Sequence, residues 1–305
     1  MKIKANGIDI EVEDTSGAGE PVLLIMGLGG QLVHFPASFV SALVQAGYRV
    51  VRFDNRDAGL SRHFSEAGTP NTLGNVLRYM TRMPVKSAYT LHDMAHDALG
   101  VLDALGIARA HVFGVSMGGM IAQRLALAAP ERCATLTSVM SSSGARDLPG
   151  PRAKAWRAMA AKPKTGHGAE KVVQYYLNFF STVGGPAFPL DEAELRAVVL
   201  HSMARNHDPV GTFRQMAAIM ADTTRADELP RLRCPTLVLH GDADPLVRIE
   251  CGQDTARRIP SARWVVIPGG GHDASPAAFA AYLRHWLPFA GEHPAHANNP
   301  QPVVS

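Results

Sequence analysis

Short, largely apolar runs recur along the chain and alternate with segments of helical spacing. The apolar runs lie at Pro21–Met26, Tyr48–Phe53, Val112–Val115, Ala134–Met140, Pro235–His240 and Trp264–Ile267. Continuous runs of this kind are typical of strands buried on both faces of a parallel sheet. The start of the chain differs, because Lys2–Asp14 alternates in polarity around Asn6 and Gly7, which predicts a β-hairpin.

Helical periodicity fills most of the intervals between these predicted strands. The predicted helices cover Pro36–Ala46, Leu73–Met80, Leu91–Leu105, the segment from Ser116 to Ala129, Gln253–Ile259 and Pro276–Trp286. Thr90 is a suitable N-cap for the third of these helices, and Gly106 is suited to end it. Strands that alternate with helices indicate an α/β fold, with a mostly parallel central sheet flanked by helices.

The chain from 146 to 229 contains no run typical of a buried strand. Four helical segments are predicted there instead, at Arg152–Ala161, Glu170–Phe180, Glu192–Ala204 and Gly211–Met220. We therefore expect a core formed by residues 1–145 and 230–288, with a helical cap, residues 146–229, inserted after the sixth strand. Residues 289–305 are polar and rich in proline, so they are expected to form a disordered tail.

Composition narrows the class of protein. Of 305 residues, 46% are hydrophobic and 19% are charged, which fits a globular chain with a large core. The formal net charge is only +3 and the basic residues are scattered, so neither a nucleic-acid nor a membrane partner is expected. The apolar stretches are too short for a transmembrane helix, and the first residues lack the apolar core of a signal peptide.

The cysteines and histidines show no pattern typical of a metal site. Cys133, Cys234 and Cys251 are an odd number without metal-ligand spacing, and free thiols indicate a reducing, cytoplasmic location. His92 and His96 are four residues apart but lack a nearby HExxH pattern, so they are expected to share one helix face. No metal is expected, and the sequence leaves open whether the chain forms a homodimer.

The segment Gly114–Gly118, GVSMG, joins a predicted strand to a predicted helix and matches the pattern G-x-S-x-G. In a sharp strand-to-helix turn, the residues two before and two after the apex must be very small. Glycine meets that requirement at both positions here. The turn would present the Ser116 hydroxyl at the start of a helix, whose N–H groups suit a developing negative charge.

A serine hydroxyl needs a base, and the base needs an acid that orients it. Two later strand ends offer both groups. Asp242 and Asp244 follow the run that ends at His240, and His272 follows the run that ends at Ile267. In a parallel sheet the carboxyl ends of the strands lie at one edge, where ligands bind, so these side chains are expected to converge on Ser116.

These motifs resemble those of the α/β-hydrolase superfamily over nearly the whole chain up to about Pro288. The matching segments are GVSMGG at the nucleophile elbow, HGDADPLV at the acid loop, GGGHD at the histidine loop and MGLGG at the oxyanion turn. FDNRDAGLS resembles the family's usual loop after the next strand. Within the superfamily, MGLGGQLVHFP and GVSMGGMIAQ are similar to bacterial carboxylesterases of the aclacinomycin-methylesterase type.

The resemblance implies a role for each matching residue. Ser116 would be the nucleophile, His272 the base and Asp244 the acid, because the family's acid usually precedes a Pro-Leu-Val segment. Asp242 would then be a turn-forming residue. The two oxyanion-hole donors would be the backbone N–H groups of Met117 and Leu28. Gly29 is the alternative to Leu28.

The predicted function is hydrolysis of a carboxylic ester without a cofactor. The partner would be a small ester with a hydrophobic acyl or alcohol group, held in an apolar pocket. The pocket candidates are Gly29, His34, Tyr176, Phe180, Phe213 and Met216. The same three catalytic groups would also suit a cofactor-free perhydrolase, a C–C bond hydrolase or a lactonase. A remote alternative is a small-ligand receptor without catalysis. The charged residues Asp54 and Arg56 are expected to brace their loop.

Overall fold

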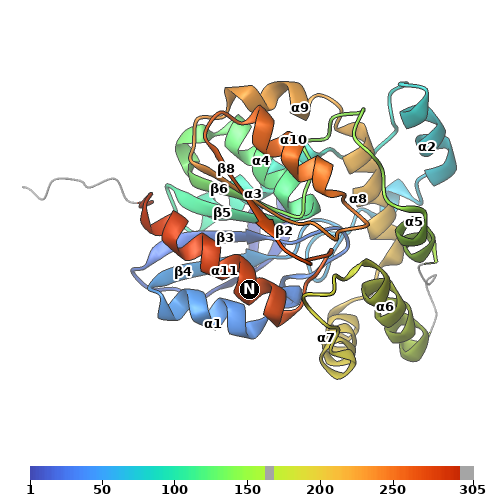
Figure 1. Cartoon of the computed structure of the whole chain (residues 1–305), viewed down its shortest axis with the longest axis horizontal. Helices are drawn as coiled ribbons and strands as arrows, with labels where there is room; N and C mark the ends of the chain where they lie inside the picture. The colour runs from blue at the N-terminus through green and yellow to red at the C-terminus, as the bar shows by residue number, and fades with distance from the viewer. Residues whose placement is uncertain (162–167, 296–305) are drawn as a thin grey trace, which may run out of the picture.

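A single mixed sheet organises the computed structural model, which describes residues 1–161 and 168–295 (Figure 1). Its strands are β1 (Lys2–Ala5), β2 (Ile8–Asp14), β3 (Glu20–Ile25), β4 (Tyr48–Phe53), β5 (Ala110–Val115), β6 (Cys133–Val139), β7 (Thr236–Gly241) and β8 (Ala262–Ile267). Their order across the sheet is β1-β2-β4-β3-β5-β6-β7-β8. Only the pairs β1–β2 and β2–β4 are antiparallel, so the predicted hairpin and mostly parallel sheet are confirmed.

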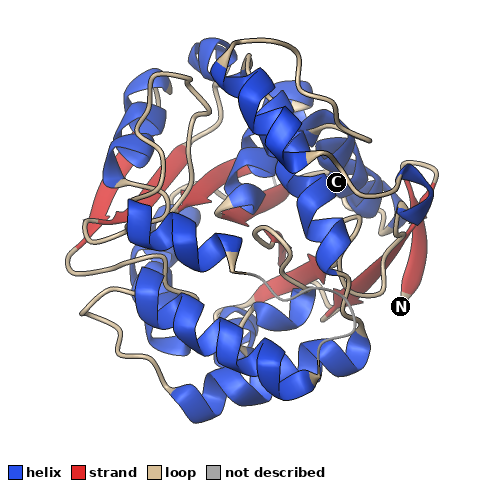
Figure 2. Ribbon diagram, turned by 90° about the vertical axis from the view of Figure 1, so that its right-hand side faces the viewer, coloured by secondary structure: helices blue, strands red, loops and turns tan. Residues whose placement is uncertain are grey.

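Helices cover both faces of this sheet, as the two views at right angles show (Figures 1 and 2). The helices of the described residues are α1 (Ala37–Gln45), α2 (Thr72–Met80), α3 (Leu91–Ala104), α4 (Met117–Ala128), α5 (Ala153–Ala160), α6 (Ala169–Val183), α7 (Glu192–Arg205), α8 (Pro209–Ala221), α9 (Arg225–Glu228), α10 (Ile249–Arg258) and α11 (Pro276–Gly291). One apolar core joins α3 and α4 to the sheet, and a second core joins α1 and α11 to its other face.

The strands are buried because helices lie on both sides of them. Every residue of β5, β6 and β7 is buried, which explains the largely apolar runs of β5 and β7, although three buried polar residues interrupt the run in β6. The residues of β2 instead alternate between buried and more exposed positions along part of its length, as expected near the edge of a sheet.

The predicted tail begins too early. We expected it from residue 289, but α11 continues through Pro288 to Gly291. Proline lacks an N–H group for the helix, yet its fixed φ suits a helical backbone. Phe289 and Ala290 are buried against the sheet, and this burial outweighs the missing hydrogen bond. The remainder of the predicted tail, 296–305, lies outside the described residues.

The chain between β6 and β7 is helical in the part that the structure describes. Helices α5 to α8 lie together at one side of the sheet, on the right in Figure 1, and α9 follows them. A small apolar cluster joins α6 to α7 through Val172, Val173, Leu177 and Val199. Four of these helices match the predicted segments, whereas the single turn of α9 is too short to show a periodic pattern.

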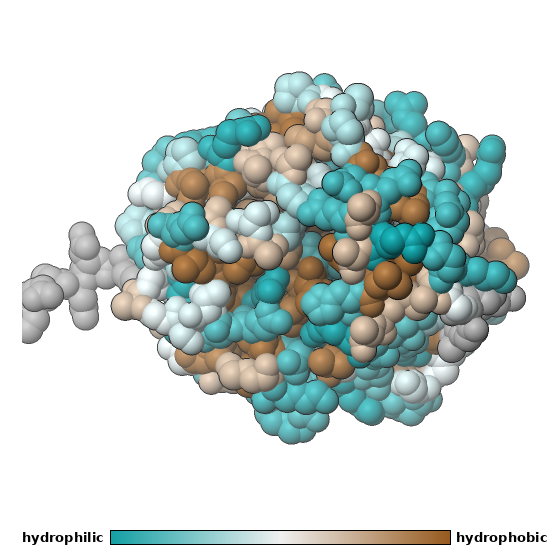
Figure 3. Space-filling model, turned by 90° about the horizontal axis from the view of Figure 1, so that it is seen from below, coloured by the Kyte–Doolittle hydropathy of each residue, from teal (hydrophilic) through white to brown (hydrophobic). Residues whose placement is uncertain are grey.

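The face seen from below is of mixed polarity over the described residues. Figure 3 shows hydrophobic and hydrophilic residues interspersed there. Among the helices in the described part of the chain, none combines the length and hydropathy needed to cross a membrane.

Candidate active site

Ser116 occupies a strained turn between β5 and α4. Its φ is 55° and its ψ is −119°, a backbone conformation that residues with a side chain rarely adopt. The close approach of neighbouring backbone explains the two glycines. A Cβ atom at Gly118 would collide with the carbonyl oxygen of Ile25, and one at Gly114 would collide with that of Gly118. Only glycine fits at these two positions. The tight turn that they allow places Ser116 at the carboxyl end of β5.

The side chains of Ser116, His272 and Asp244 form a continuous hydrogen-bonded relay. His272 Nε2 lies 3.1 Å from Ser116 Oγ, and His272 Nδ1 lies 2.7 Å from Asp244 Oδ2. An imidazole that donates from Nδ1 to the carboxylate keeps Nε2 free to accept the serine proton. The carboxylate is buried, and its Oδ1 accepts hydrogen bonds from the N–H groups of Leu246 and Val247. Its orientation is therefore fixed.

The two candidate acids lie in different surroundings. Asp244 is buried beside His272, whereas Asp242 is exposed and accepts a hydrogen bond of 2.7 Å from the N–H of Gly269. Asp242 thus joins the acid loop to the histidine loop without reaching the imidazole. A third carboxylate, Asp273, accepts hydrogen bonds from Gly185 and Gly271, and burial raises its pKa. It anchors the histidine loop to the chain after α6.

The turn after β3 lies directly against Ser116. Its ends are closed by a hydrogen bond of 3.0 Å from Gly30 N–H to the Gly27 carbonyl, and Gly29 has a φ of 67°. A Cβ atom at Gly27 would lie 3.1 Å from Ser116 Cβ. This close approach places the backbone of the turn next to the hydroxyl, where a second oxyanion donor is needed.

The hydrogen bonds of this turn separate the two candidate donors. Gly29 N–H donates to Oε1 of Gln215 at 2.7 Å, so that group is already engaged. For the N–H groups of Leu28 and Met117, no acceptor is found within residues 1–161 and 168–295. Leu28 is therefore the better candidate, and Gly29 serves to hold the turn.

A family model for the alpha/beta hydrolase fold matches residues 20–276 of the chain. The chain belongs to the α/β-hydrolase family. Rhodomycin D methylesterase DnrP of Streptomyces peucetius is 31% identical over 278 residues, covering 84% of this chain and 85% of that protein. The expected similarity to methylesterases is thus confirmed.

Solved structures of known proteins share the same fold. An esterase from Exiguobacterium antarcticum superposes with a TM-score of 0.72 at 19% identity, covering 95% of this α/β-hydrolase and 98% of the other chain. The enol-lactonase from Burkholderia xenovorans gives a TM-score of 0.68 at 22% identity, covering 95% of this chain and 100% of the lactonase. At this level of identity, these likenesses support the fold alone.

A small cavity of about 30 Å³ lies between the turn after β3 and helices α6 to α8. Its lining is mainly polar, and Ser116 and His272 are not part of it, so the apolar pocket expected over Ser116 stays a prediction. Gly29, His34 and Tyr176 from the predicted set line the cavity, together with residues such as Asn206 and Asp208. Phe213 lies on α8 with 37% of its surface exposed, as is typical of a surface residue. Phe180 and Met216 are partly buried and are not among the residues lining this described cavity.

His34 is held as a neutral imidazole in this cavity. Its Nδ1 accepts a hydrogen bond of 3.1 Å from the N–H of Gln31. Burial lowers its pKa to about 4, and the nearby charge of Arg205 contributes to the same effect. The unfolded chain therefore takes up a proton near pH 6.5 that the folded chain does not accept until about pH 4.

His34→Gln is expected to flatten the pH dependence of stability in that interval. Because the folded pKa is lowered, the wild type loses stability as the pH falls from about 6.5 to about 4. Glutamine does not titrate, so the melting temperature of the variant should fall less than that of the wild type over the same range. Thermal unfolding in a pH series measures the difference, with the exposed His285→Gln as control. Equal slopes for wild type and His34→Gln would contradict this account.

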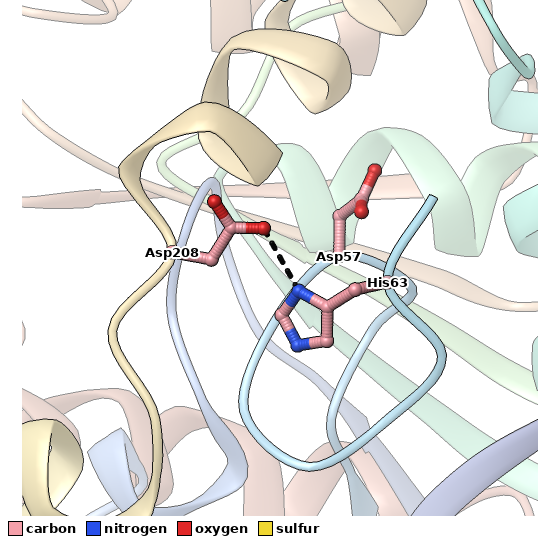
Figure 4. A group of neighbouring side chains, drawn as sticks. All are labelled: Asp57, His63 and Asp208. Atoms are coloured by element: carbon pink, nitrogen blue, oxygen red, sulfur yellow. Dashed lines mark hydrogen bonds and ion pairs between the residues drawn. The ribbon is translucent and has the colours of Figure 1, made fainter. Parts of the chain in front are cut away.

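Asp57, His63 and Asp208 bring potential metal-ligand atoms within 4.8 Å of one another (Figure 4). These atoms already have partners in the chain. Arg214 donates to both carboxylates, and His63 Nδ1 donates to Asp208 at 2.9 Å. The Asn206 amide nitrogen lies 2.8 Å from His63 Nε2. These polar contacts connect the loop after β4 to the start of α8, so we assign the group a structural role.

The loop after β4 is braced by its own charges, as predicted. The buried Asp54 carboxylate accepts from Leu32 N–H at 2.7 Å and forms an ion pair with Arg205 of α7 at 2.8 Å. Arg56 forms a buried ion pair with Asp97 of α3. The sequence showed that these charges follow a strand, but it carried no signal for their partners, which lie far along the chain.

Gln215 is the main residue of the candidate active site that sequence analysis missed. It is fully buried on α8, and its Nε2 donates to the Arg56 carbonyl at 2.7 Å while its Oε1 accepts from Gly29. Because Nε2 donates to the Arg56 carbonyl, the amide oxygen must be the atom that faces the turn after β3. Gln215 thus connects α8 to the backbone beside Ser116, and no local motif distinguishes it from any other helical glutamine.

Proposed function

We propose that this α/β-hydrolase cleaves carboxylic esters through an acyl-enzyme on Ser116. The observation that carries the proposal is the relay from Ser116 through His272 to Asp244, with distances of 3.1 and 2.7 Å. Because His272 Nε2 lies within hydrogen-bond reach of Ser116 Oγ, it can accept the serine proton as the hydroxyl attacks the ester carbonyl. The buried Asp244 carboxylate then stabilises the imidazolium that forms.

The tetrahedral intermediate requires two donors for its oxyanion. The N–H groups of Leu28 and Met117 are proposed for this role, because both border Ser116 and neither has an acceptor within the described residues. His272 returns the proton to the leaving alcohol. Water activated by the same histidine then attacks the acyl-enzyme and releases the carboxylic acid. These steps use the chain's own groups and water.

The proposed substrate is a methyl ester or another ester of a small alcohol. This choice is supported by the 31% identity to rhodomycin D methylesterase. We propose that residues 146–229 act as the cap over the site, because Gln215 from this segment binds the turn beside Ser116 and Arg205 and Arg214 bind the loop after β4.

The function is tested by steady-state hydrolysis of two ester series. A p-nitrophenyl series with increasing acyl length measures the room for the acyl part. A matched series of methyl, ethyl and butyl esters of one aromatic acid measures the preference for the alcohol part. We expect turnover in both series, with the methyl ester preferred in the second. Failure to hydrolyse any ester, while the protein remains folded, would contradict the proposal.

Gln215→Leu is expected to lower kcat by about 10- to 100-fold with KM changed by less than about threefold. Leucine has a similar size but cannot accept from Gly29, so the turn that presents Leu28 N–H loses an anchor. A positioning effect should weaken a boronic-acid transition-state analogue in parallel with kcat, while a product-like carboxylic acid binds as before.

Gln123→Leu is a matched control for that variant. Gln123 is also a fully buried helical glutamine with two side-chain hydrogen bonds, but they join it to Ser138 and Arg225. It should lose thermal stability with kcat close to that of the wild type. If both variants lose kcat equally, or if Gln215→Leu retains it, Gln215 has no special role in positioning the turn.

A further inference from the structure

Helix α2 presents its apolar side to solvent. Leu73, Leu77 and Met80 follow helical spacing and form one stripe, which Met83 extends just beyond the helix. Their exposed fractions are 81%, 61%, 74% and 50%. An amphipathic helix normally turns such a stripe toward the protein, so contiguous exposure of this kind marks an interaction site. We call these four side chains the α2 surface.

The orientation of α2 is fixed by specific contacts. Asn75, on the opposite side of the helix, is buried and exchanges two hydrogen bonds with the backbone of Lys86, at 2.8 and 3.1 Å. Asn71 caps the helix by accepting from Gly74 N–H. The inner side of α2 packs against α8. Asn75 is therefore fixed on the inner side of α2. The same contacts keep the apolar stripe facing the solvent.

The segment that carries the α2 surface is basic. Arg78, Arg82 and Lys86 lie on the same segment, and no acidic residue occurs between Glu66 and Asp93. Within the part of the chain that the structure describes, none of the three cations forms an ion pair with a carboxylate. Arg146 adds a fourth cation, since its guanidinium lies 5.2 Å from the centre of the Tyr79 ring.

We propose that the α2 surface binds an anionic lipid–water interface. Apolar side chains would enter the boundary between headgroups and acyl chains, and the cations would contact negative headgroups. A second copy of the chain is a poorer match. A two-fold contact centred on α2 would join two copies of a segment that has no acidic residue between Glu66 and Asp93, so the cations would meet no carboxylate there. Figure 1 shows α2 at the periphery, where a flat surface can reach it.

This proposal differs from the sequence-based expectation of no membrane partner. The basic residues are scattered over the whole chain, so neither net charge nor charge runs indicated a surface of this kind. Three of them lie in one short segment, and the fold exposes the apolar stripe of that same segment. The contact would be peripheral and reversible, because four apolar side chains and four cations give weak binding compared with a membrane-spanning helix.

Co-sedimentation of the full chain with phospholipid vesicles tests the proposal. The vesicles are pure phosphatidylcholine or phosphatidylcholine with about 30% phosphatidylglycerol. We expect binding to the anionic vesicles at low salt, loss of most of it at high salt, and little binding to the neutral vesicles. Leu77→Gln/Met80→Gln should weaken binding by about tenfold or more. Arg82→Gln/Lys86→Gln should weaken it by about fivefold for each charge removed.

Leu200→Gln is the matched control, because this leucine is 40% exposed on α7, outside the α2 surface. It should bind as the wild type does. Circular dichroism and turnover of a soluble ester verify that each variant is folded. Equal binding by the wild type and both double variants would overturn the proposal, as would no binding to anionic vesicles. A dimer in sedimentation velocity that Leu77→Gln/Met80→Gln dissociates would also overturn it, in favour of a second copy.

Discussion

Replacing Ser116 with alanine is expected to lower kcat for ester hydrolysis by about 10⁴- to 10⁶-fold. The alanine variant lacks the oxygen that would form the acyl-enzyme, while the oxyanion donors and the binding surfaces remain. The residual rate should therefore be that of water attack assisted by the remaining site. Steady-state kinetics of the purified variant against the best ester measures the loss, and KM should change little.

Two further serine variants make this result specific. Ser143→Ala removes another buried serine hydroxyl, which donates to Asp254 away from the relay, and should keep its kcat. Ser116→Gly should be as inactive as Ser116→Ala but should unfold at a higher temperature, because glycine tolerates a φ of 55°. An active Ser116→Ala enzyme, free of wild-type contamination, would contradict the acyl-enzyme mechanism.

Asp244→Asn is expected to lower kcat by about 10⁴-fold at neutral pH. The asparagine amide can keep the hydrogen bond to His272 but favours the tautomer that carries its proton on Nε2. That tautomer cannot accept the proton of Ser116, which lies 3.1 Å away. The imidazolium would also lose its charged partner. Single-turnover kinetics should locate the defect in formation of the acyl-enzyme.

Asp242→Asn is a control two residues away in the same loop. Its side chain keeps an oxygen that can accept from Gly269 N–H, so the contact between the two loops survives. We expect kcat within about threefold of the wild-type value, since Asp242 does not touch the imidazole. A large loss in Asp242→Asn together with an active Asp244→Asn would reassign the acid and show that the relay differs from the geometry described.

Sequence patterns predicted the strands well because each strand is buried on both sides. Continuous apolar runs then identify it without knowledge of its neighbours, as for β5 and β7. The elbow was predictable for a similar reason. Its strain and close approaches require glycine at fixed distances from Ser116, so the constraint is local and visible in the sequence.

The partners of the site could not be predicted because they come from remote segments. Gln215 and Arg205 bind Gly29 and Asp54 across more than one hundred residues of chain, and nothing local distinguishes them. The choice between Leu28 and Gly29 depended on where one N–H group points. The outward stripe of α2 was hidden for another reason, since an amphipathic pattern shows that a helix has two sides but not which side faces the core.

Mapping of a covalent adduct tests the central claim most directly, because it asks which atom attacks an ester-like electrophile. The wild type, Ser116→Ala and His272→Ala would be treated with an alkyl fluorophosphonate, digested and sequenced by mass spectrometry. We predict one adduct on Ser116 in the wild type, none in Ser116→Ala, and labelling slowed by at least about 1000-fold in His272→Ala. An active wild type that is labelled at another residue, or not at all, would contradict the account.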